Sequence, residues 1–262
     1  MVIIIVVILS IYFLAPFRTN AVFIGVDYAP EENYVARSDT IVLASIVPHK
    51  PYIGILSIPR DLWVNIPGIG ENRINTAHFF AEANSPGSGP YALMETIQVN
   101  FGIEMDYYVR IRFEGVREVI NALGGVDLEL TEPMAGYPAG LHHLNGNKAL
   151  AFARHRMGSD DFFRMEQGQL LMMSIFKQSL LPRNWHRFPW VIFTGLKVID
   201  TDLPWWQLPR LGLAILRAGP DGIDRQMVDR ESVTPFVTNQ GASVLLPEWS
   251  QILKKVELIF HN

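Results

Sequence analysis

The chain has 262 residues, 49% of them hydrophobic, with a formal net charge of −4 at pH 7. This length suits one large α/β domain, or two small ones, with a substantial core. The acidic balance gives no reason to expect nucleic acid as a partner, which disfavours a DNA-binding regulator. Because cysteine is absent, disulfides and cysteine-ligated metal sites are excluded.

The first segment is strongly apolar, since residues 2–17 contain no charged side chain. A helix of that length spans roughly 24 Å, slightly less than a hydrocarbon core of about 30 Å. No small-residue cleavage site precedes Arg18. We therefore predict a signal anchor over residues 1–18 and one folded domain over residues 19–262. A buried β-strand is the alternative, because Ile and Val also favour strands.

The remaining pattern interleaves strands and helices. Apolar, β-branched runs predict strands at 21–26, 40–47, 52–58, 107–111, 126–130 and 191–199. Amphipathic periodicity and capping signals predict helices at 75–83, 91–101, 113–123, 146–153, 161–181, 206–217 and 248–260. The fold class expected from this order is α/β, a mixed central sheet flanked by helices on both faces.

Charged residues gather at the ends of two of these strands. Arg37 and Asp39 come just before the strand at 40–47, and Arg60 and Asp61 follow the strand at 52–58. The turn at 48–51 predicts that the two strands form a hairpin, which places Asp39 and Asp61 at one sheet edge. Adjacent carboxylates favour a bound cation or flanking guanidinium groups, and Mg²⁺ accepts one or two carboxylates together with phosphate oxygens.

A second group of charges lies between the helices predicted at 146–153 and 161–181. Arg154, Arg156 and Arg164 fall within eleven residues, beside Asp160 and Asp161. Acidic side chains are favourable in the first turn of a helix, whereas a cation there indicates a nearby anion. Taken together, the Asp and Arg groups indicate a diphosphate with its metal as the ligand.

The order of these motifs resembles the LytR–CpsA–Psr family. It comprises Arg37-Ser38-Asp39-Thr40, Ser57-Ile58-Pro59-Arg60-Asp61, Arg73-Ile74-Asn75, Leu123-Gly124-Gly125-Val126, Leu144-Asn145-Gly146 with Ala149-Leu150-Ala151-Phe152-Ala153-Arg154-His155-Arg156, and Asp160-Asp161-Phe162-Phe163-Arg164. Each motif alone is common, but six in this order form a specific signal that runs from about residue 22 to residue 181.

The resemblance implies a three-layer sandwich and a phosphotransferase. It would join a glycopolymer, such as teichoic acid or capsular polysaccharide, from a polyprenyl-pyrophosphate carrier to peptidoglycan through a phosphodiester. Members are single-pass proteins of the cell membrane with an extracytoplasmic domain, an apolar lipid pocket, and Mg²⁺ (or Mn²⁺) beside the pyrophosphate.

The site residues implied by motif position are as follows. Asp39 and Asp61 are the expected metal ligands, and Asp61, Arg60 and Arg156 the expected catalytic residues, with either Asp61 or Asp39 as the base. The expected pyrophosphate ligands are Arg37, Arg60, Arg73, Arg154, Arg156, Arg164 and Gln167.

One departure from the family pattern keeps other functions open. Similar proteins carry Arg and Gln where Gln167 and Gly168 stand here. A pyrophosphatase acting on the same lipid-linked glycan, or a carrier-binding module without activity, would fit the same motifs. The helix at 170–181 and Phe79, Phe80, Met94 and Ile97 are candidates to line the lipid pocket, although core packing is the commoner role for such residues.

Overall fold

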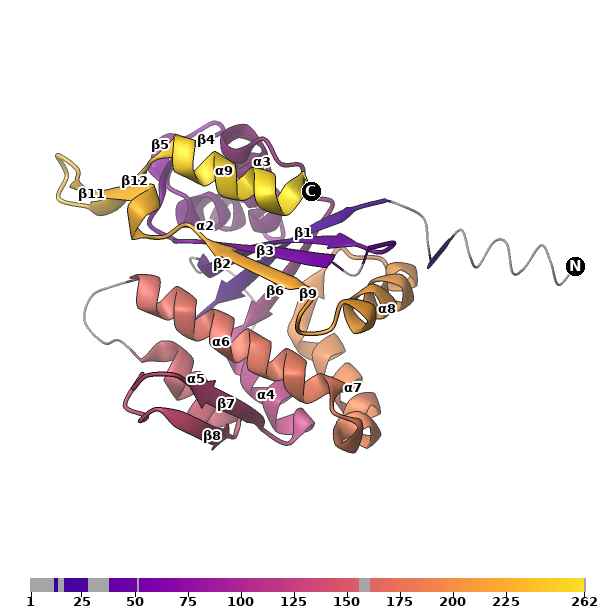
Figure 1. The fold of residues 1–262 in the computed structure, drawn as a ribbon. Coiled ribbons are helices and arrows are strands. Elements are labelled where there is room, and N and C mark those ends of the chain that lie inside the picture. The colour runs from indigo at the N-terminus through magenta and orange to yellow at the C-terminus, as the bar shows by residue number, and fades with distance from the viewer. Residues whose placement is uncertain (1–11, 14–16, 28–37, 51, 156–160, 262) are drawn as a thin grey trace, which may run out of the picture.

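A six-stranded mixed sheet forms the centre of the molecule (Figure 1), in the order β10-β3-β2-β1-β6-β9. The computed structural model describes residues 12–13, 17–27, 38–50, 52–155 and 161–261. The sheet consists of β1 (Thr19–Val26), β2 (Ser38–Val47), β3 (Tyr52–Ile58), β6 (Tyr107–Arg112), β9 (Ile199–Thr201) and β10 (Ile223–Met227). The pairs β1–β6 and β3–β10 are parallel, whereas the other neighbours are antiparallel.

The predicted hairpin between β2 and β3 is confirmed. The two strands pair from Val47 with Tyr52 to Ile41 with Ile58, so that β2 begins at the sheet edge where β3 ends. This register places Asp39 opposite the segment that carries Arg60 and Asp61.

Helices cover both faces of the sheet, as predicted (Figure 1). On one face lie α2 (Asn75–Asn84), α3 (Gly89–Phe101) and α9 (Trp249–Phe260). On the other lie α4 (Phe113–Leu123), α6 (Asp161–Leu180) and α8 (Leu208–Ala218), with α5 (Gly146–Arg154) and α7 (Phe188–Val198) farther from the sheet. The fold class is therefore mixed α/β in three layers.

The side chains of β1 alternate between the main core on one face of the sheet and a cavity on the other. Val22, Ile24 and Val26 are fully buried and join the core cluster that includes Ile97 of α3 and Ile252 of α9. Burying each such side chain contributes about 2 kcal/mol. The side chains between them point to the opposite face of the sheet, and one of these, Phe23, is 37% exposed. That exposure marks the cavity described below.

Three two-stranded sheets flank the central one. They are β4 (Trp63–Ile66) with β5 (Gly70–Arg73), β7 (Val126–Leu130) with β8 (Gly140–Leu144), and β11 (Val233–Val237) with β12 (Ser243–Pro247). The 3₁₀ helices η1 (Pro182–Arg187), η2 (Trp205–Gln207) and η3 (Arg230–Ser232) complete the described elements. The β7–β8 hairpin packs with α4, α5 and α6 around a second core of its own.

A buried ion network fastens β6 to α2. Arg110 and Glu82 are each 3% exposed, and Arg110 Nη1 lies 3.0 Å from Glu82 Oε2, while Nη2 lies 2.6 Å from Asp200 Oδ2. Glu82 also accepts hydrogen bonds from the backbone N–H groups of Gly87 and Gly89. Burial acts to raise the pKa of Glu82, but these hydrogen bonds and the Arg110 charge outweigh it and lower the pKa.

The strand predicted at 191–199 is wrong, because residues 188–198 form α7 and the strand β9 begins only at Ile199. Pro189 in the first turn is preorganised for a helix, and β-branched residues cost a helix only tenths of a kcal/mol each.

The predicted anchor lies almost wholly outside the described residues. None of the described helices combines the length and the apolar content needed to cross a bilayer.

Candidate functional site

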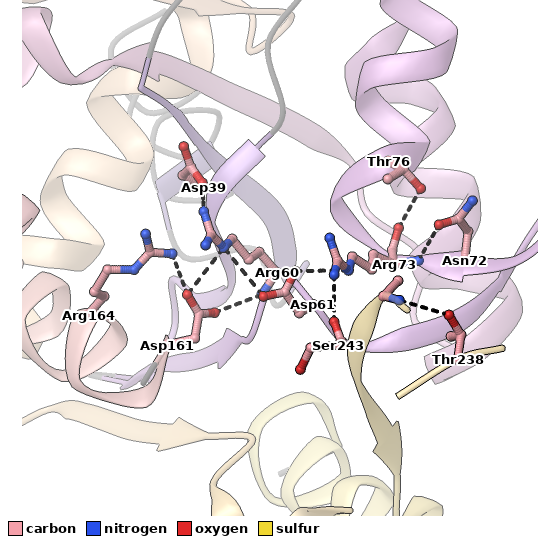
Figure 2. Close-up of polar contacts among 11 residues, drawn as sticks. Asp39, Arg60, Asp61, Asn72, Arg73, Thr76, Asp161, Arg164, Thr238 and Ser243 are labelled. Carbon is pink, nitrogen blue, oxygen red and sulfur yellow. Dashed lines mark hydrogen bonds and ion pairs between the residues drawn. The ribbon is translucent and has the colours of Figure 1, made fainter. Parts of the chain in front are cut away.

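Arg60 lies at the centre of a charged cluster (Figure 2). Its backbone follows β3 directly, and its guanidinium donates from Nη1 to Asp39 Oδ1. Arg60 Nε lies 3.3 Å from Asp161 Oδ1 and 3.7 Å from Asp61 Oδ2. One guanidinium group thus contacts three carboxylates that come from β2, from the turn after β3 and from the start of α6.

Asp161 connects this group to α6. It is the first residue of the helix, where a carboxylate interacts favourably with the helix dipole, and its Oδ2 accepts a hydrogen bond of 3.3 Å from the backbone N–H of Arg60. Arg164, one turn later, pairs with Asp161 Oδ1. Asp161 was not among the predicted site residues, although its position three residues before Arg164 in a first turn is a signal that could have identified it.

Arg73 extends the cluster on the opposite side. It ends β5, and its Nε lies 3.3 Å from Asp61 Oδ1. Its Nη2 donates a 2.6 Å hydrogen bond to the carbonyl oxygen of Ser243 at the start of β12. The backbone N–H of Leu245 in turn bonds to the carbonyl oxygen of Asp61. The β11–β12 hairpin therefore holds Asp61 and Arg73 in place.

Burial and neighbouring charges have opposing effects on the pKa values of the cluster. Burial raises the pKa of the Asp61 carboxyl, and the charge of Asp161 adds to this, against the opposing effect of Arg60, Arg73 and Arg164. For Arg60, burial alone would lower the pKa, but its three carboxylate neighbours outweigh burial and raise the pKa. Among the described residues, the cluster contains three arginines and three aspartates, so an added diphosphate would leave these six side chains with an excess of negative charge.

A cavity of about 480 Å³ opens beside this cluster, between the sheet and α4, α5 and α6. We call it the donor cavity. Its charged lining comes from residues at the ends of their elements: Asp27, Asp39, Arg154, Asp161 and Arg164. The rest of the lining is mainly apolar and includes Phe23, Val42, Ile111, Phe113, Leu171, Met172 and Ile175.

The charged and apolar parts of the donor cavity are separated along α6. Ile175 lies eleven residues, hence about 16 Å, beyond Arg164 on that helix, and both line the cavity. The cavity therefore has a charged end at the Arg60 cluster and an apolar interior.

Arg154 belongs to a separate ion-paired group at the same charged end. Its Nη2 contacts Asp27 Oδ1 and lies 2.8 Å from Glu114 Oε1. Neither Asp27 nor Glu114 was among the predicted site residues, and neither stands in a motif that the sequence marked. Arg154 thus lines the donor cavity without contacting Arg60.

The predicted site residues divide into three groups. Asp39, Arg60, Asp61, Arg73 and Arg164 come together, and Arg154 shares the cavity. Within the described part of the chain, Gln167 is buried and is not among the lining residues, whereas Gly168 is. Arg37 and Arg156 lie outside the described residues.

Only some of the residues predicted to line the lipid pocket line the donor cavity. Leu171, Met172 and Ile175, from the predicted helix at 170–181, line the donor cavity. Met94 and Ile97 instead pack in the main core, which is the commoner role of such residues. Phe79 and Phe80 are not part of the described lining of this cavity either.

The cluster suits a divalent cation in its chemistry. Among the described residues, no group of three or more Asp, Glu or His side chains is arranged to hold a metal ion. Mg²⁺, however, needs only one or two protein carboxylates when water and phosphate oxygens fill its other positions. Asp39 and Asp61 supply such oxygens, and the charge balance leaves room for a cation once a diphosphate is present.

Comparisons with known proteins match most of the chain to one family. A model of the LytR_cpsA_psr family matches residues 17–256. The polyisoprenyl-teichoic acid–peptidoglycan teichoic acid transferase TagU of Oceanobacillus iheyensis is 36% identical over 141 residues, which cover 52% of this chain and 43% of that protein. The chain thus spans less than half the length of this curated relative.

Solved structures show the same fold. TagV of B. subtilis superposes with a TM-score of 0.73 at 23% identity, covering 94% of this chain and 98% of that one. TagT bound to LIIa-WTA superposes with a TM-score of 0.73 at 21% identity, covering 94% and 91%.

Proposed function

The chain belongs to the LytR–CpsA–Psr family, and we propose that it transfers a glycopolymer from a polyprenyl-pyrophosphate carrier to peptidoglycan, as a phosphodiester. The observation that carries the proposal is the donor cavity, which joins an apolar interior to a charged end containing Asp39, Asp161 and Arg164. A lipid diphosphate has this same division, an apolar chain next to a doubly phosphorylated head. The similarity to TagU, a polyisoprenyl-teichoic acid–peptidoglycan teichoic acid transferase, supports the same proposal.

Donor binding follows from the two halves of the cavity. The apolar lining takes the polyprenyl chain, because burying apolar surface contributes about 25 cal/mol per Å². Arg60, Arg73, Arg154 and Arg164 bind the diphosphate, since guanidinium groups form paired, charge-assisted hydrogen bonds with phosphate oxygens. The sequence motif adds Arg37 and Arg156 to this proposal, whereas the buried position of Gln167 outside the cavity lining argues against it as a ligand.

A metal ion would complete the headgroup site. Asp39 and Asp61 would hold Mg²⁺ (or Mn²⁺), which would neutralise part of the charge on the phosphoryl oxygens when bound.

The reaction is a displacement at the sugar-linked phosphorus. An acceptor hydroxyl forms the new O–P bond, the bond from that phosphorus to the bridging oxygen breaks, and polyprenyl phosphate leaves with the electron pair. The hydroxyl proton passes to the carboxylate of Asp61 or Asp39. The guanidinium groups stabilise charge that develops on the phosphoryl oxygens, because phosphoryl transfer depends mainly on positioning and electrostatics.

A position at the outer face of the cell membrane is also part of the proposal. It is supported by the apolar segment at 2–17 and by large exposed apolar side chains on α7, η2 and α8, among them Trp190, Leu196, Trp205 and Leu216. These elements lie on the side of the molecule where β1 begins (Figure 1), and Arg210 of α8 donates to the carbonyl oxygen of Phe17. Exposed apolar groups that include tryptophan are typical of membrane-interface contacts.

Incubation with a lipid-linked glycopolymer, Mg²⁺ and peptidoglycan tests the proposed activity. The proposal predicts polymer covalently joined to peptidoglycan, together with polyprenyl phosphate. Release of polymer phosphate into solution would instead identify a pyrophosphatase. Saturable donor binding without turnover would identify a carrier-binding module, and either result would overturn the proposal.

A further inference from the structure

A second hollow lies on the far side of the charged cluster from the donor cavity. It measures about 570 Å³ and is formed by β4, β5, the start of α2 and the turn between β11 and β12. Arg73 belongs to its lining. In Figure 2, Asp39 and Arg164 lie on one side of Arg60, and Asn72, Thr76 and Thr238 of the second hollow lie on the other.

The lining of this hollow differs in chemistry from that of the donor cavity. It presents two aromatic rings, those of Trp63 and Phe80, and three side-chain amides, those of Asn72, Asn239 and Gln240. Phe80 is exposed although it is a large apolar residue. Aromatic faces pack against the C–H faces of sugar rings, and amides both donate to and accept from hydroxyl and N-acetyl groups. This combination suits a glycan and offers no apolar interior for a lipid.

A short series of ion pairs connects the two hollows. Arg73 Nε is 3.3 Å from Asp61, Asp61 is 3.7 Å from Arg60 Nε, and Arg60 contacts Asp39 of the donor cavity. A group held in the second hollow would therefore approach the cluster from the side opposite the donor. In phosphoryl transfer the attacking and leaving oxygens lie roughly in line through the phosphorus, so donor and acceptor need opposite approaches.

The walls of the second hollow are held by hydrogen bonds. Asn72 Oδ1 accepts from the backbone N–H of Arg73, and Thr76 Oγ1 donates to the carbonyl oxygen of Arg73. On the facing turn, Thr238 Oγ1 accepts from the backbone N–H of Ala242. A site with fixed walls loses little conformational entropy when a ligand binds.

We propose that this hollow is the acceptor groove, which binds the N-acetylated amino-sugar backbone of peptidoglycan and presents its hydroxyl to the cluster beside Arg73 and Asp61. The inference rests on the proposed transferase function, because it names the site of the second substrate. Phe80 and Trp63 pack against the sugar rings, and Asn239 and Gln240 set specificity by hydrogen bonding to hydroxyl and N-acetyl groups.

The test uses exposed residues whose replacement leaves the fold intact. Phe80→Ala, and the double variant Asn239→Ala with Gln240→Ala, are made in the full chain. Val237→Ala is the matched control, because Val237 is exposed on the same hairpin and is not part of the described groove lining. The KM for soluble peptidoglycan fragments should rise at least about tenfold in both groove variants, with the KM for the lipid-linked donor unchanged. An unchanged KM for the acceptor would overturn the inference.

A binding measurement separates this inference from the proposed function. Soluble disaccharide fragments of N-acetylglucosamine and N-acetylmuramic acid are titrated into the full chain without donor, and binding is followed by saturation-transfer NMR. Binding that the groove variants weaken and Val237→Ala preserves supports the acceptor groove even where no transfer is detected. Equal binding by all variants, or none by the unmodified chain, overturns the groove without affecting donor turnover.

Discussion

Replacement of Arg60 by glutamine probes the charged cluster most sharply. Arg60→Gln removes a guanidinium group that contacts Asp39, Asp61 and Asp161. Breaking a fully buried ion pair from one side costs about 3–5 kcal/mol. Because the Arg60 side chain is 27% exposed, we expect a smaller loss of unfolding free energy, about 2 kcal/mol. Most of that loss is repulsion among the carboxylates left behind.

The same change also removes a phosphate ligand. Loss of one charge-assisted donor at a developing anion typically costs about 2.7–4 kcal/mol, which predicts a fall in kcat/KM of about 10²–10³. Arg60→Lys is the matched control: it keeps the charge but cannot reach three carboxylates, so we expect an intermediate fall.

The assay measures transfer rates and urea unfolding with and without Mg²⁺. Mg²⁺ should recover part of the stability lost in Arg60→Gln, because it can occupy the space between the carboxylates, but it should not restore the rate. A transfer rate within about threefold of the unmodified chain would exclude Arg60 as a phosphate ligand, and a stability that does not depend on Mg²⁺ would exclude a cation between the carboxylates.

Three further predictions concern other parts of the molecule. The folded-state pKa of Glu82 is lowered below its ordinary 4.5, so its stabilising pairing with Arg110 is present above that value and is lost as the pH falls through the lowered pKa. Glu82→Gln should therefore lower the urea midpoint at pH 7, with the difference from the unmodified chain shrinking as the pH falls below 4.5. Gly168→Gln should lower the KM for the donor, because the new amide faces the donor cavity. It should also raise the free energy of unfolding by about 0.5 kcal/mol, since a Cβ at this position meets no atom within 4 Å. An unchanged KM would show that the amide does not reach the headgroup. A nitroxide on Leu196→Cys, in a chain without native cysteine, should show bilayer-depth collision rates in lipid nanodiscs, whereas one on Val99→Cys of α3 should show aqueous rates; equal aqueous rates would contradict a membrane-facing α7.

Local sequence signals predicted the central layers of the fold. The hairpin at 40–58 and the helix at 113–123 follow from uninterrupted apolar runs, a proline-bounded turn and a Gly124-Gly125 stop, each of which acts within a few residues. The edge strand β10, with the sequence Ile-Asp-Arg-Gln-Met, had no such signal. It forms because it pairs with β3 over five residues, and that partner is distant in sequence.

The site was predictable where its residues stand in motifs. The proximity of Asp39, Arg60 and Asp61 followed from the expected hairpin. Asp27 and Glu114 could not be predicted, because their pairing with Arg154 depends on how α4 and α5 pack against the end of β1. The acceptor groove was invisible for the same reason, since its amides come from segments more than 150 residues apart, at Asn72 and Asn239.

The fate of the sugar-linked phosphorus distinguishes transfer to the cell wall from hydrolysis of the donor. A donor labelled with ³²P at that phosphorus alone is incubated with the chain, Mg²⁺ and peptidoglycan, and the insoluble wall, the lipid and the aqueous fractions are counted. Transfer to peptidoglycan predicts that the label enters the wall fraction in a phosphodiester, while the lipid leaves as unlabelled polyprenyl phosphate. Label recovered with the lipid, or in water as polymer phosphate, would contradict it.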